Sequence, residues 1–197
     1  MADSELEALL QRSGAIMRGH FLQTSSRHSD VYVEKFRVLE QPAVLSRLCS
    51  EIAATFAGNG IDVVAGPTTG GIIIAFEVAR QMGLPALYVE SEEGRRTLRR
   101  GATIEPGARV LVVDDVLTTG TSVLEVIEAI QVRGGVPAGV AVLIDRSAKP
   151  IDFGCSFSAA HRVEAVSYAP DEVPAWLNEI PIVKPGTRVS DNKAQKA

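Results

Sequence analysis

Residues 109–132 constrain the fold most, because a strand pattern passes directly into a helix pattern there. Val110–Val113 is an unbroken apolar run, which is typical of a strand buried on both faces of a parallel sheet. Over Ser122–Val132 apolar residues recur at helical spacing, so a helix is expected. Asp114 and Asp115 come directly after the apolar run, and a loop of small residues precedes the helix. This order favours a ligand site at the end of the strand.

The loop between the acids and the helix has the composition of a phosphate site. Its small residues are Thr118, Thr119, Gly120, Thr121 and Ser122. A helix N-terminus leaves backbone N–H groups unpaired and carries partial positive charge, while the hydroxyls add donors. The loop lacks the lysine of an ATP-type phosphate loop, and the two acids suit hydroxyl groups, so a phosphorylated sugar is the better ligand. The plainer interpretation, a strand end followed by a helix cap, requires the whole pattern to be coincidental.

The composition is that of an ordinary globular chain. Of 197 residues, 22% are charged and 46% are apolar, which is typical of a soluble protein with one domain. The net charge of −4 argues against nucleic acid as the main partner and means that an anionic substrate needs a local positive patch. Cys49 and Cys155 lie far apart without a metal-binding pattern, which favours reduced thiols. The chain shows neither an apolar run of about 18 residues nor a signal-peptide pattern, so we expect a cytoplasmic protein without membrane contact.

Strand and helix patterns alternate along the middle of the chain. The expected strands are 61–65, 86–89, 109–115, 137–145 and 157–166, and the expected helices are 5–13, 42–57, 72–82 and 122–132. This alternation predicts an α/β fold with a mostly parallel central sheet flanked by helices. We expect a single domain over 1–197, with an N-terminal hood and helix at 1–41, an α/β core at 42–170 and a C-terminal tail at 171–197. Because residues 19–40 are crowded with polar groups and alternate poorly, irregular strands and loops are expected in the hood.

A second strand-to-helix turn has the sequence GPTTGG, at residues 66–71. Alone, it is equally well explained as a tight connection, and it lacks the patterns for ATP or a dinucleotide. Ligands of parallel sheets bind at the carboxyl ends of the strands, where both turns are expected. Beside the first loop, Thr68, Thr69, Gly70 and Gly71 become a candidate cradle for a second anionic group.

Arginines gather in the polar segment ESEEGRRTLRRG, residues 90–101. Four of them, Arg95, Arg96, Arg99 and Arg100, fall within six positions. A solvated loop is one interpretation. The other is a mobile basic lid, which would stabilise a departing anion and exclude water as it closed.

Two further residues are candidates for a site. Arg146 follows Asp145 at the end of an expected strand, where it is either a plain exposed arginine or a fork-like contact for a carboxylate or paired carbonyls. The histidine spacing suggests no metal site, and among the three histidines only His28 is placed near a site.

The motif VLVVDDVLTTGTS, residues 110–122, resembles the phosphoribosyl-diphosphate (PRPP) binding motif of the type I phosphoribosyltransferases. The resemblance implies that the two acids engage the ribose hydroxyls directly or through Mg²⁺. It further implies that the loop holds the 5-phosphate and that GPTTGG holds the pyrophosphate. The PRPP-binding residues so implied are Asp114, Asp115, Val116, Leu117, Thr118, Thr119, Gly120, Thr121, Ser122, Thr68, Thr69, Gly70 and Gly71.

Within this family, three further stretches resemble the orotate-specific branch. Residues 19–40 are similar to its N-terminal hood, EEGRRTLRRG is similar to the lid of one of its bacterial groups, and Asp145-Arg146 resembles its D-R pair. The orotate contacts so implied are Thr118, Arg146, His28 and Lys35, and the catalytic residues are Asp114, Asp115, Arg95 and Arg96.

The reaction implied by the resemblance is Mg²⁺-dependent transfer of 5-phosphoribosyl from PRPP to a ring nitrogen of orotate, with inversion at the anomeric carbon. The products are orotidine 5-monophosphate and pyrophosphate. The family also implies a homodimer in which each lid reaches the neighbour's active site. This chain departs from the orotate branch in three places: Gly70 replaces a lysine of the pyrophosphate turn, Ser26 replaces a glycine of the hood pattern, and the lid carries only arginines, which do not readily donate a proton.

Other functions fit parts of the same pattern. A phosphoribosyltransferase for purines or another base would keep the Asp114 loop but not the roles of the hood and Arg146. A non-catalytic PRPP-sensing regulator would keep the scaffold, but it would usually add a nucleic-acid-binding element or a basic excess, which this chain does not show. An unrelated sugar-phosphate enzyme is the third alternative.

Overall fold

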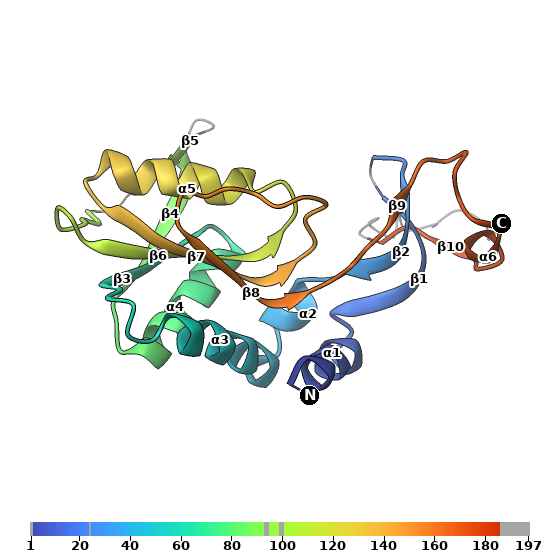
Figure 1. Ribbon diagram of the computed structural model, residues 1–197, viewed down its shortest axis with the longest axis horizontal. Coiled ribbons are helices and arrows are strands. Elements are labelled where there is room, and N and C mark those ends of the chain that lie inside the picture. Colours follow the sequence, from blue (N-terminus) through green and yellow to red (C-terminus); the bar gives the residue numbers. More distant parts are fainter. Residues whose placement is uncertain (1, 24, 93–94, 99–100, 186–197) are drawn as a thin grey trace, which may run out of the picture. The chain divides into compact units, whose positions relative to one another are not determined.

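The computed structural model describes residues 2–23, 25–92, 95–98 and 101–185, and the chain divides into two compact units (Figure 1). The core unit comprises Met1–Ala15 with Lys35–Glu164, and the hairpin unit comprises Ile16–Glu34 with Ala165–Ala197. Compact units are not the same as independently folding domains, so the single domain expected over 1–197 stays a prediction.

The core unit is built on a six-stranded sheet in the order β5-β4-β3-β6-β7-β8. Its strands are β3 (Val63–Pro67), β4 (Ala86–Glu92), β5 (Arg95–Thr97), β6 (Arg109–Leu117), β7 (Val136–Asp145) and β8 (Ser156–Arg162). Neighbouring strands are parallel except for β4 and β5, which are antiparallel. The predicted α/β fold with a mostly parallel central sheet is confirmed.

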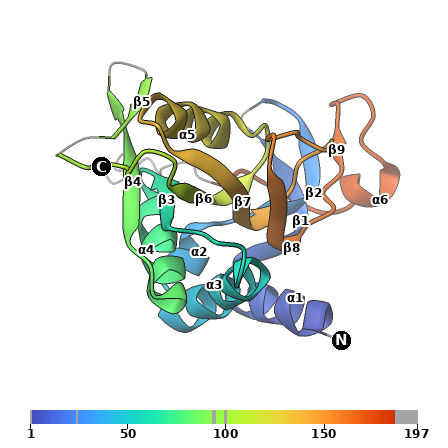
Figure 2. The ribbon, with the colours of Figure 1, turned by 60° about the vertical axis from the view of Figure 1, so that its left-hand side comes forward.

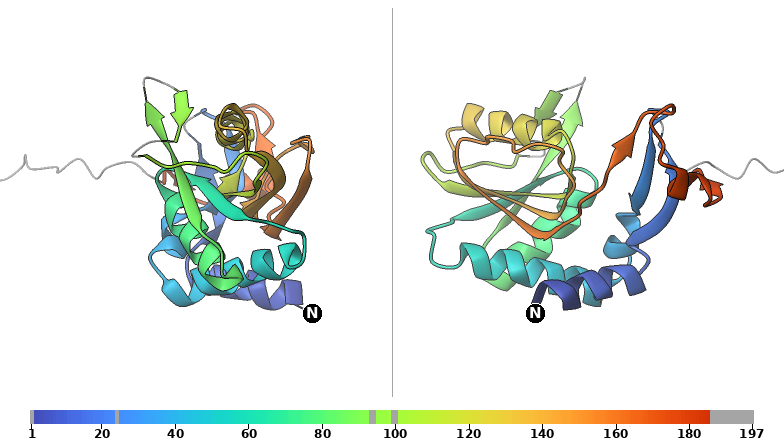
Figure 3. Two further views of the ribbon diagram at one scale, coloured as in Figure 1. Left: turned by 90° about the vertical axis from the view of Figure 1, so that its left-hand side faces the viewer. Right: turned by 45° about the vertical axis from the view of Figure 1, so that its right-hand side comes forward.

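Helices cover both faces of this sheet. The helices described in the core unit are α1 (Ala2–Arg12), α2 (Phe36–Leu39), α3 (Pro42–Phe56), α4 (Gly70–Met82) and α5 (Thr121–Val132). Figures 2 and 3 show α5 on one face, and α3 and α4 on the other. Pro42 starts α3, a position where its missing N–H removes no helical hydrogen bond.

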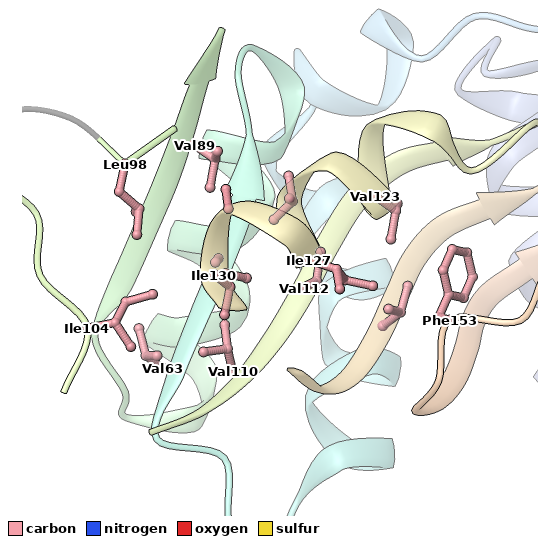
Figure 4. Packing of buried hydrophobic residues seen from close by; sticks show 14 of the residues in the cluster. Val63, Val89, Leu98, Ile104, Val110, Val112, Val123, Ile127, Ile130 and Phe153 are labelled. Atoms are coloured by element: carbon pink, nitrogen blue, oxygen red, sulfur yellow. The ribbon is translucent and has the colours of Figure 1, made fainter. Parts of the chain in front are cut away.

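A continuous apolar cluster holds α5 against the sheet (Figure 4). Val110 and Val112 of β6 belong to it, as do Ile127 and Ile130 of α5, and each of the four is at most 8% exposed. Helical spacing places the two isoleucines on one side of α5, and burying an aliphatic side chain of this size contributes about 1.5–3 kcal/mol. This packing holds the N-terminus of α5 at the carboxyl end of β6.

The hairpin unit contains a four-stranded sheet in the order β10-β1-β2-β9. Its elements are β1 (Ile16–Leu22), β2 (His28–Val33), β9 (Ser167–Tyr168), α6 (Ala175–Asn178) and β10 (Ile182–Val183). β1 pairs antiparallel with β2 and parallel with β10.

The expected irregular strands and loops over residues 19–40 are confirmed in part: two strands with an irregular register are present, whereas the helical turn α2 was not predicted. β1 and β2 form an antiparallel hairpin, and α2 is a helical turn. The register of the hairpin shifts between Arg18 and Phe21. Such an irregularity interrupts the two-residue alternation of side chains, which is why the sequence pattern looked irregular.

The polar loop predicted over residues 90–101 was also wrong in part. β4 continues to Glu92, and β5 returns antiparallel to it. Leu98, directly after β5, is 3% exposed and belongs to the apolar cluster, so it anchors this polar segment to the core unit. Arg99 and Arg100, predicted as part of a basic lid, lie outside the described residues.

Other predicted boundaries differ by a few residues. α4 begins at Gly70 instead of residue 72, β6 continues past Asp115 to Leu117, and β8 ends at Arg162 instead of residue 166. Element ends depend on backbone hydrogen bonds that sequence periodicity does not encode. Because β6 is longer than predicted, Val116 and Leu117 are strand residues and not part of the loop.

The cysteines are free thiols, as predicted. Burial raises the pKa of Cys49 to about 12, so this thiol stays protonated near neutral pH. Along the part of the chain that the structure describes, no helix combines the length and the apolar character needed to cross a membrane.

Candidate active site

The turn between β6 and α5 forms the first half of the site. β6 carries Asp114 and Asp115 near its carboxyl end, and Gly120 directly precedes α5. Gly120 has a positive φ of 78°, a conformation that glycine adopts without side-chain strain. A Cβ at this position would also come within 3.0 Å of Ile151 Cδ1. Both the backbone conformation and the limited space therefore favour glycine here.

Asp114 ties the strand to the helix. Its Oδ1 accepts a hydrogen bond from the backbone N–H of Asp115 at 2.8 Å, and its Oδ2 accepts one from the Ser122 hydroxyl at 2.7 Å. Asp114 is 6% exposed, and burial, followed by the charge of Asp115, raises the pKa of its carboxyl group. The carboxyl group thus lies beside the first turn of α5, where hydroxyls of a ligand bound at that turn would meet it.

Asp115 faces away from Asp114, as the two-residue alternation of a strand predicts. Its Oδ1 accepts a hydrogen bond from the N–H of Val116 at 2.7 Å, and its Oδ2 lies 2.9 Å from Lys35 Nζ. A Cβ on Gly70 would collide with the same Oδ2. The second acid therefore reaches the start of α4, while the first lies on the α5 side.

The turn between β3 and α4 forms the second half of the site, at the end of a strand that pairs with β6. A Cβ on Gly66 would collide with the carbonyl oxygen of Gly71, and a Cβ on Gly71 would lie 2.6 Å from Pro67 Cδ. A cis peptide bond joins Thr68 and Thr69. α4 begins at the next residue, so the unpaired N–H groups of its first turn belong to this turn. A closely packed backbone at a helix N-terminus can bind a second anion.

Arg96 of β5 reaches the same turn. Its Nη1 donates to the carbonyl oxygen of Thr68 at 3.2 Å and to the hydroxyl of that threonine at 3.1 Å, while its Nε donates to Glu125 of α5 at 3.3 Å. The side chain of Arg96 is 17% exposed, whereas Arg95 is an exposed residue. Of the two predicted lid arginines that the structure describes, Arg96 therefore contacts the glycine-rich turn and Arg95 faces solvent.

Arg146 lies at the end of β7, which is the other neighbour of β6. Its backbone N–H donates to the carbonyl oxygen of Leu117 at 3.0 Å, next to the exposed Thr118. Two of the predicted orotate contacts, Thr118 and Arg146, thus share one edge of the sheet with the two acids.

The other two predicted orotate contacts have different surroundings. Lys35 pairs with Asp115. His28 belongs to the hairpin unit, where its Nδ1 lies 2.6 Å from Nε2 of the buried His20. The Nδ1 of His20 in turn donates to the carbonyl oxygen of Ile180 at 3.2 Å. Sequence reasoning missed both pairings, since no local spacing links the partners.

The donor groups of the site fit a magnesium ion. Mg²⁺ prefers carboxylate, phosphate and water oxygens, and it is usually held by one or two carboxylates together with substrate phosphates. Asp114 and Asp115 offer two carboxylates at one strand end. Among the described residues, no group of three or more His, Cys, Asp or Glu side chains could hold a metal ion by itself. The site therefore suits an ion held mainly by a substrate, with one of these acids as a protein ligand.

Known proteins resemble the chain both in sequence and in structure. A family model described as "Phosphoribosyl transferase domain" matches residues 37–169. An orotate phosphoribosyltransferase of Pelotomaculum thermopropionicum is 51% identical over 95% of this chain and 99% of its own length, and one of Chlorobaculum parvum is 44% identical over 95% and 97%. The crystal structure of orotate phosphoribosyltransferase from Aeropyrum pernix aligns with a TM-score of 0.67 at 28% identity, covering 81% of this chain and 94% of that one.

Proposed function

The chain belongs to the phosphoribosyltransferase family, and on that premise we propose that it transfers the 5-phosphoribosyl group of PRPP to orotate. The products are orotidine 5-monophosphate and pyrophosphate, as in pyrimidine synthesis. One observation carries the assignment of PRPP: two strand-to-helix turns lie at one sheet edge, and Asp115 of one lies against Gly70 of the other. The names of the similar proteins support orotate as the acceptor.

The β6–α5 turn suits the phosphorylated sugar. Backbone N–H groups at the N-terminus of α5 favour an anion, so we assign the 5-phosphate to residues 118–122. The hydroxyls of Thr119 and Thr121, 3.1 Å apart, are further donors. Asp114 and Asp115 are assigned to the ribose hydroxyls, because carboxylates accept hydrogen bonds.

Two other residues predicted to bind PRPP take a smaller part in the proposal. Val116 and Leu117 are the last residues of β6. Leu117 is 2% exposed, and its carbonyl oxygen already accepts the N–H of Arg146. We therefore assign these two residues the role of placing the loop that follows, and not a side-chain contact with the ligand.

The β3–α4 turn suits the pyrophosphate. Gly70 and Gly71 begin α4, where backbone N–H groups are unpaired, and Thr68 and Thr69 directly precede them. Arg96 bonds to Thr68, so a guanidinium is already at this turn to stabilise the charge that develops on the leaving group. Closure of the β4–β5 hairpin as a lid, which would exclude water, is also part of the proposal.

In the proposed reaction, a ring nitrogen of orotate attacks the anomeric carbon of PRPP as the bond to pyrophosphate breaks, so the configuration inverts. Arg146 and Thr118 would hold orotate at the ends of β7 and β6, because a guanidinium makes paired contacts with a carboxylate. His28 is a further proposed contact. When bound, Mg²⁺ supplies positive charge to the pyrophosphate, and Asp114 or Asp115 would help to hold it.

We also propose a cytoplasmic homodimer with shared active sites. Three large apolar side chains of the core unit support an interface: Phe36 of α2 is 58% exposed, and Ile73 and Phe76 of α4 are 42% and 64% exposed. Exposed side chains of this kind are enriched at interfaces between subunits. The free thiols of Cys49 and Cys155 support a reducing compartment.

The direct test is to incubate the purified protein with PRPP, Mg²⁺ and orotate and to follow the loss of orotate absorbance. We expect turnover that requires all three components. A panel of purine and other bases, run in parallel, tests the alternative of a different acceptor. PRPP binding by calorimetry without turnover of any base would instead favour a PRPP-sensing regulator.

A further inference from the structure

Lys35, for which the family resemblance implied an orotate contact, forms an ion pair that the sequence did not indicate. It directly precedes α2, outside both ligand-binding turns, yet its Nζ lies 2.9 Å from Asp115 Oδ2. Asp115 is largely buried, with a side chain that is 9% exposed, whereas the side chain of Lys35 is 43% exposed. The ammonium group therefore neutralises a buried acid and still presents part of its surface to solvent.

The same Asp115 oxygen borders the glycine-rich turn. A Cβ on Gly70 would collide with Oδ2, so the carboxylate lies directly against the start of α4. An anion bound at this turn would meet the negative charge of Asp115, and the turn itself, residues 66–71, carries no charged side chain to offset it. A cationic side chain that offsets this charge has to come from another segment, because like charges at short range repel strongly where water is excluded.

Two cationic side chains described by the structure come from other segments and lie at or beside this turn. Arg96 contacts Thr68, and Lys35 contacts Asp115 beside Gly70. They approach the turn from β5 and from the start of α2. A protein with a net charge of −4 needs such a local positive patch to bind a polyanion.

We infer that Lys35 binds the pyrophosphate group of PRPP, with its ammonium shared between that group and Asp115, and that it does not bind orotate. This inference rests on the proposed function only in taking PRPP as the ligand of the two turns. It reassigns a residue for which the family resemblance implied an orotate contact. The physical reason is that Lys35 is ion-paired at the α4 side of Asp115, whereas Thr118 and Arg146 follow the ends of β6 and β7.

The test measures the affinities of PRPP, pyrophosphate and ribose 5-phosphate by calorimetry. Mg²⁺ is present in each measurement, and no base is added. For Lys35→Met we expect affinity for PRPP and for pyrophosphate to fall by about tenfold, the usual effect of losing a charged hydrogen bond. Affinity for ribose 5-phosphate, which lacks the pyrophosphate, is expected to change by less than about twofold. Because no base is present, the result stands even if orotate proves not to be the acceptor.

Two control variants accompany this measurement. Lys35→Arg keeps the positive charge and is expected to retain PRPP affinity within about threefold. Arg47→Met removes a cation from an ion pair with Glu51 on α3, where the arginine side chain is also 43% exposed, and it should leave all three affinities unchanged. Circular dichroism and thermal unfolding establish whether each variant is folded. If Lys35→Met does not fold, Lys35→Gln serves as a second variant without the charge.

Several outcomes would overturn the inference. Equal losses for ribose 5-phosphate and PRPP would mean that Lys35 acts only through Asp115 on the ribose. Unchanged PRPP and pyrophosphate affinities would remove any role in binding the pyrophosphate. In steady-state assays, a rise in the KM for orotate without a rise in the KM for PRPP would restore the orotate contact.

Discussion

The two turns at the sheet edge have the same construction but different chemistry. Each follows a parallel strand and leads into a helix, and the strands, β3 and β6, are hydrogen-bonded neighbours. The β6–α5 turn and its strand end carry two carboxylates and four hydroxyls. The β3–α4 turn carries glycines that leave no room for a side chain, and none of its residues is charged. One turn presents side chains to a ligand, and the other presents its backbone.

This difference predicts how each turn responds to substitution. Where function depends on side chains, an isosteric change removes activity and leaves the fold intact. Where function depends on a close backbone approach, even a methyl group disturbs the fold itself. The two turns also differ in where their charges come from. The carboxylates of the β6–α5 turn belong to its own strand end, whereas the cations near the glycine-rich turn, Lys35 and Arg96, belong to other elements.

The largest effect is expected for Gly66→Ala in the β3–α4 turn. The new methyl group would collide with the backbone carbonyl of Gly71, so the turn has to move. We expect a loss of about 3 kcal/mol in the free energy of unfolding, measured by urea denaturation, together with loss of PRPP binding. Gly107→Ala is the control, because a Cβ there meets nothing within 4 Å and only its positive φ of 82° is unfavourable, at about 1 kcal/mol. Equal costs for the two variants would contradict the role assigned to space.

Asp114→Asn tests the opposite behaviour in the β6–α5 turn. The amide keeps the shape but loses the charge: its oxygen can accept the N–H of Asp115, and its Nδ2 can donate to the Ser122 hydroxyl oxygen. We expect kcat/KM for PRPP to fall by about 100-fold, or about 2.7 kcal/mol of transition-state stabilisation, without loss of folding. A variant with full activity would show that the carboxylate does not act on the sugar.

The same variant is expected to change the pH dependence of stability. Burial raises the pKa of Asp114 above its ordinary value of 3.8. As pH rises, the unfolded state therefore loses the proton of this carboxyl group at a lower pH than the folded state does. The contribution of this group is therefore most favourable at low pH and is lost as pH rises through the folded-state pKa. Denaturation curves from pH 4 upward should show Asp114→Asn gaining stability relative to the parent protein as pH increases. A constant difference between the two proteins would contradict the burial effect.

Arg146→Ala tests whether a side chain at the end of the neighbouring strand β7 also binds substrate. Because Arg146 follows β7 and its backbone N–H donates to Leu117, the residue before the 5-phosphate loop, we expect the KM for orotate to rise by about tenfold. The KM for PRPP should change much less. Steady-state kinetics with each substrate varied in turn separate the two, and unaltered orotate kinetics would refute the assignment.

The smallest effect is expected for Ser26→Gly. This variant measures the effect of a positive φ on stability at a position where packing does not restrict the side chain. Ser26 has a positive φ of 61° and is exposed, whereas Gly120 combines a positive φ with close packing against Ile151. Glycine relieves the left-handed strain at residue 26 but has more conformational entropy to lose on folding. We expect a net gain of about 0.5 kcal/mol by thermal unfolding, and a loss of stability would mean that the Ser26 side chain contributes interactions that outweigh the strain.

Much of the fold followed from local patterns. The apolar run at Val110–Val113 predicted a central strand, and the alternation of elements predicted a mostly parallel sheet, both of which the structure confirms. Prediction was least complete where local pattern and tertiary packing disagree. In the β1–β2 hairpin a register shift hides the alternation, and beside β5 the buried Leu98 anchors a segment that reads as a polar loop.

The amino-acid sequence alone was enough to predict which chemical groups stand at the ends of which elements, because helical and strand periodicity are properties of neighbouring residues. It placed the acids Asp114 and Asp115 on opposite sides of a strand and the hydroxyls at the start of a helix. The pairing of Lys35 with Asp115 and the contact of Arg96 with Thr68 became known only from the folded chain. These partners are 80 and 28 positions apart, and their contacts depend on how helices and strands pack, which no local spacing records.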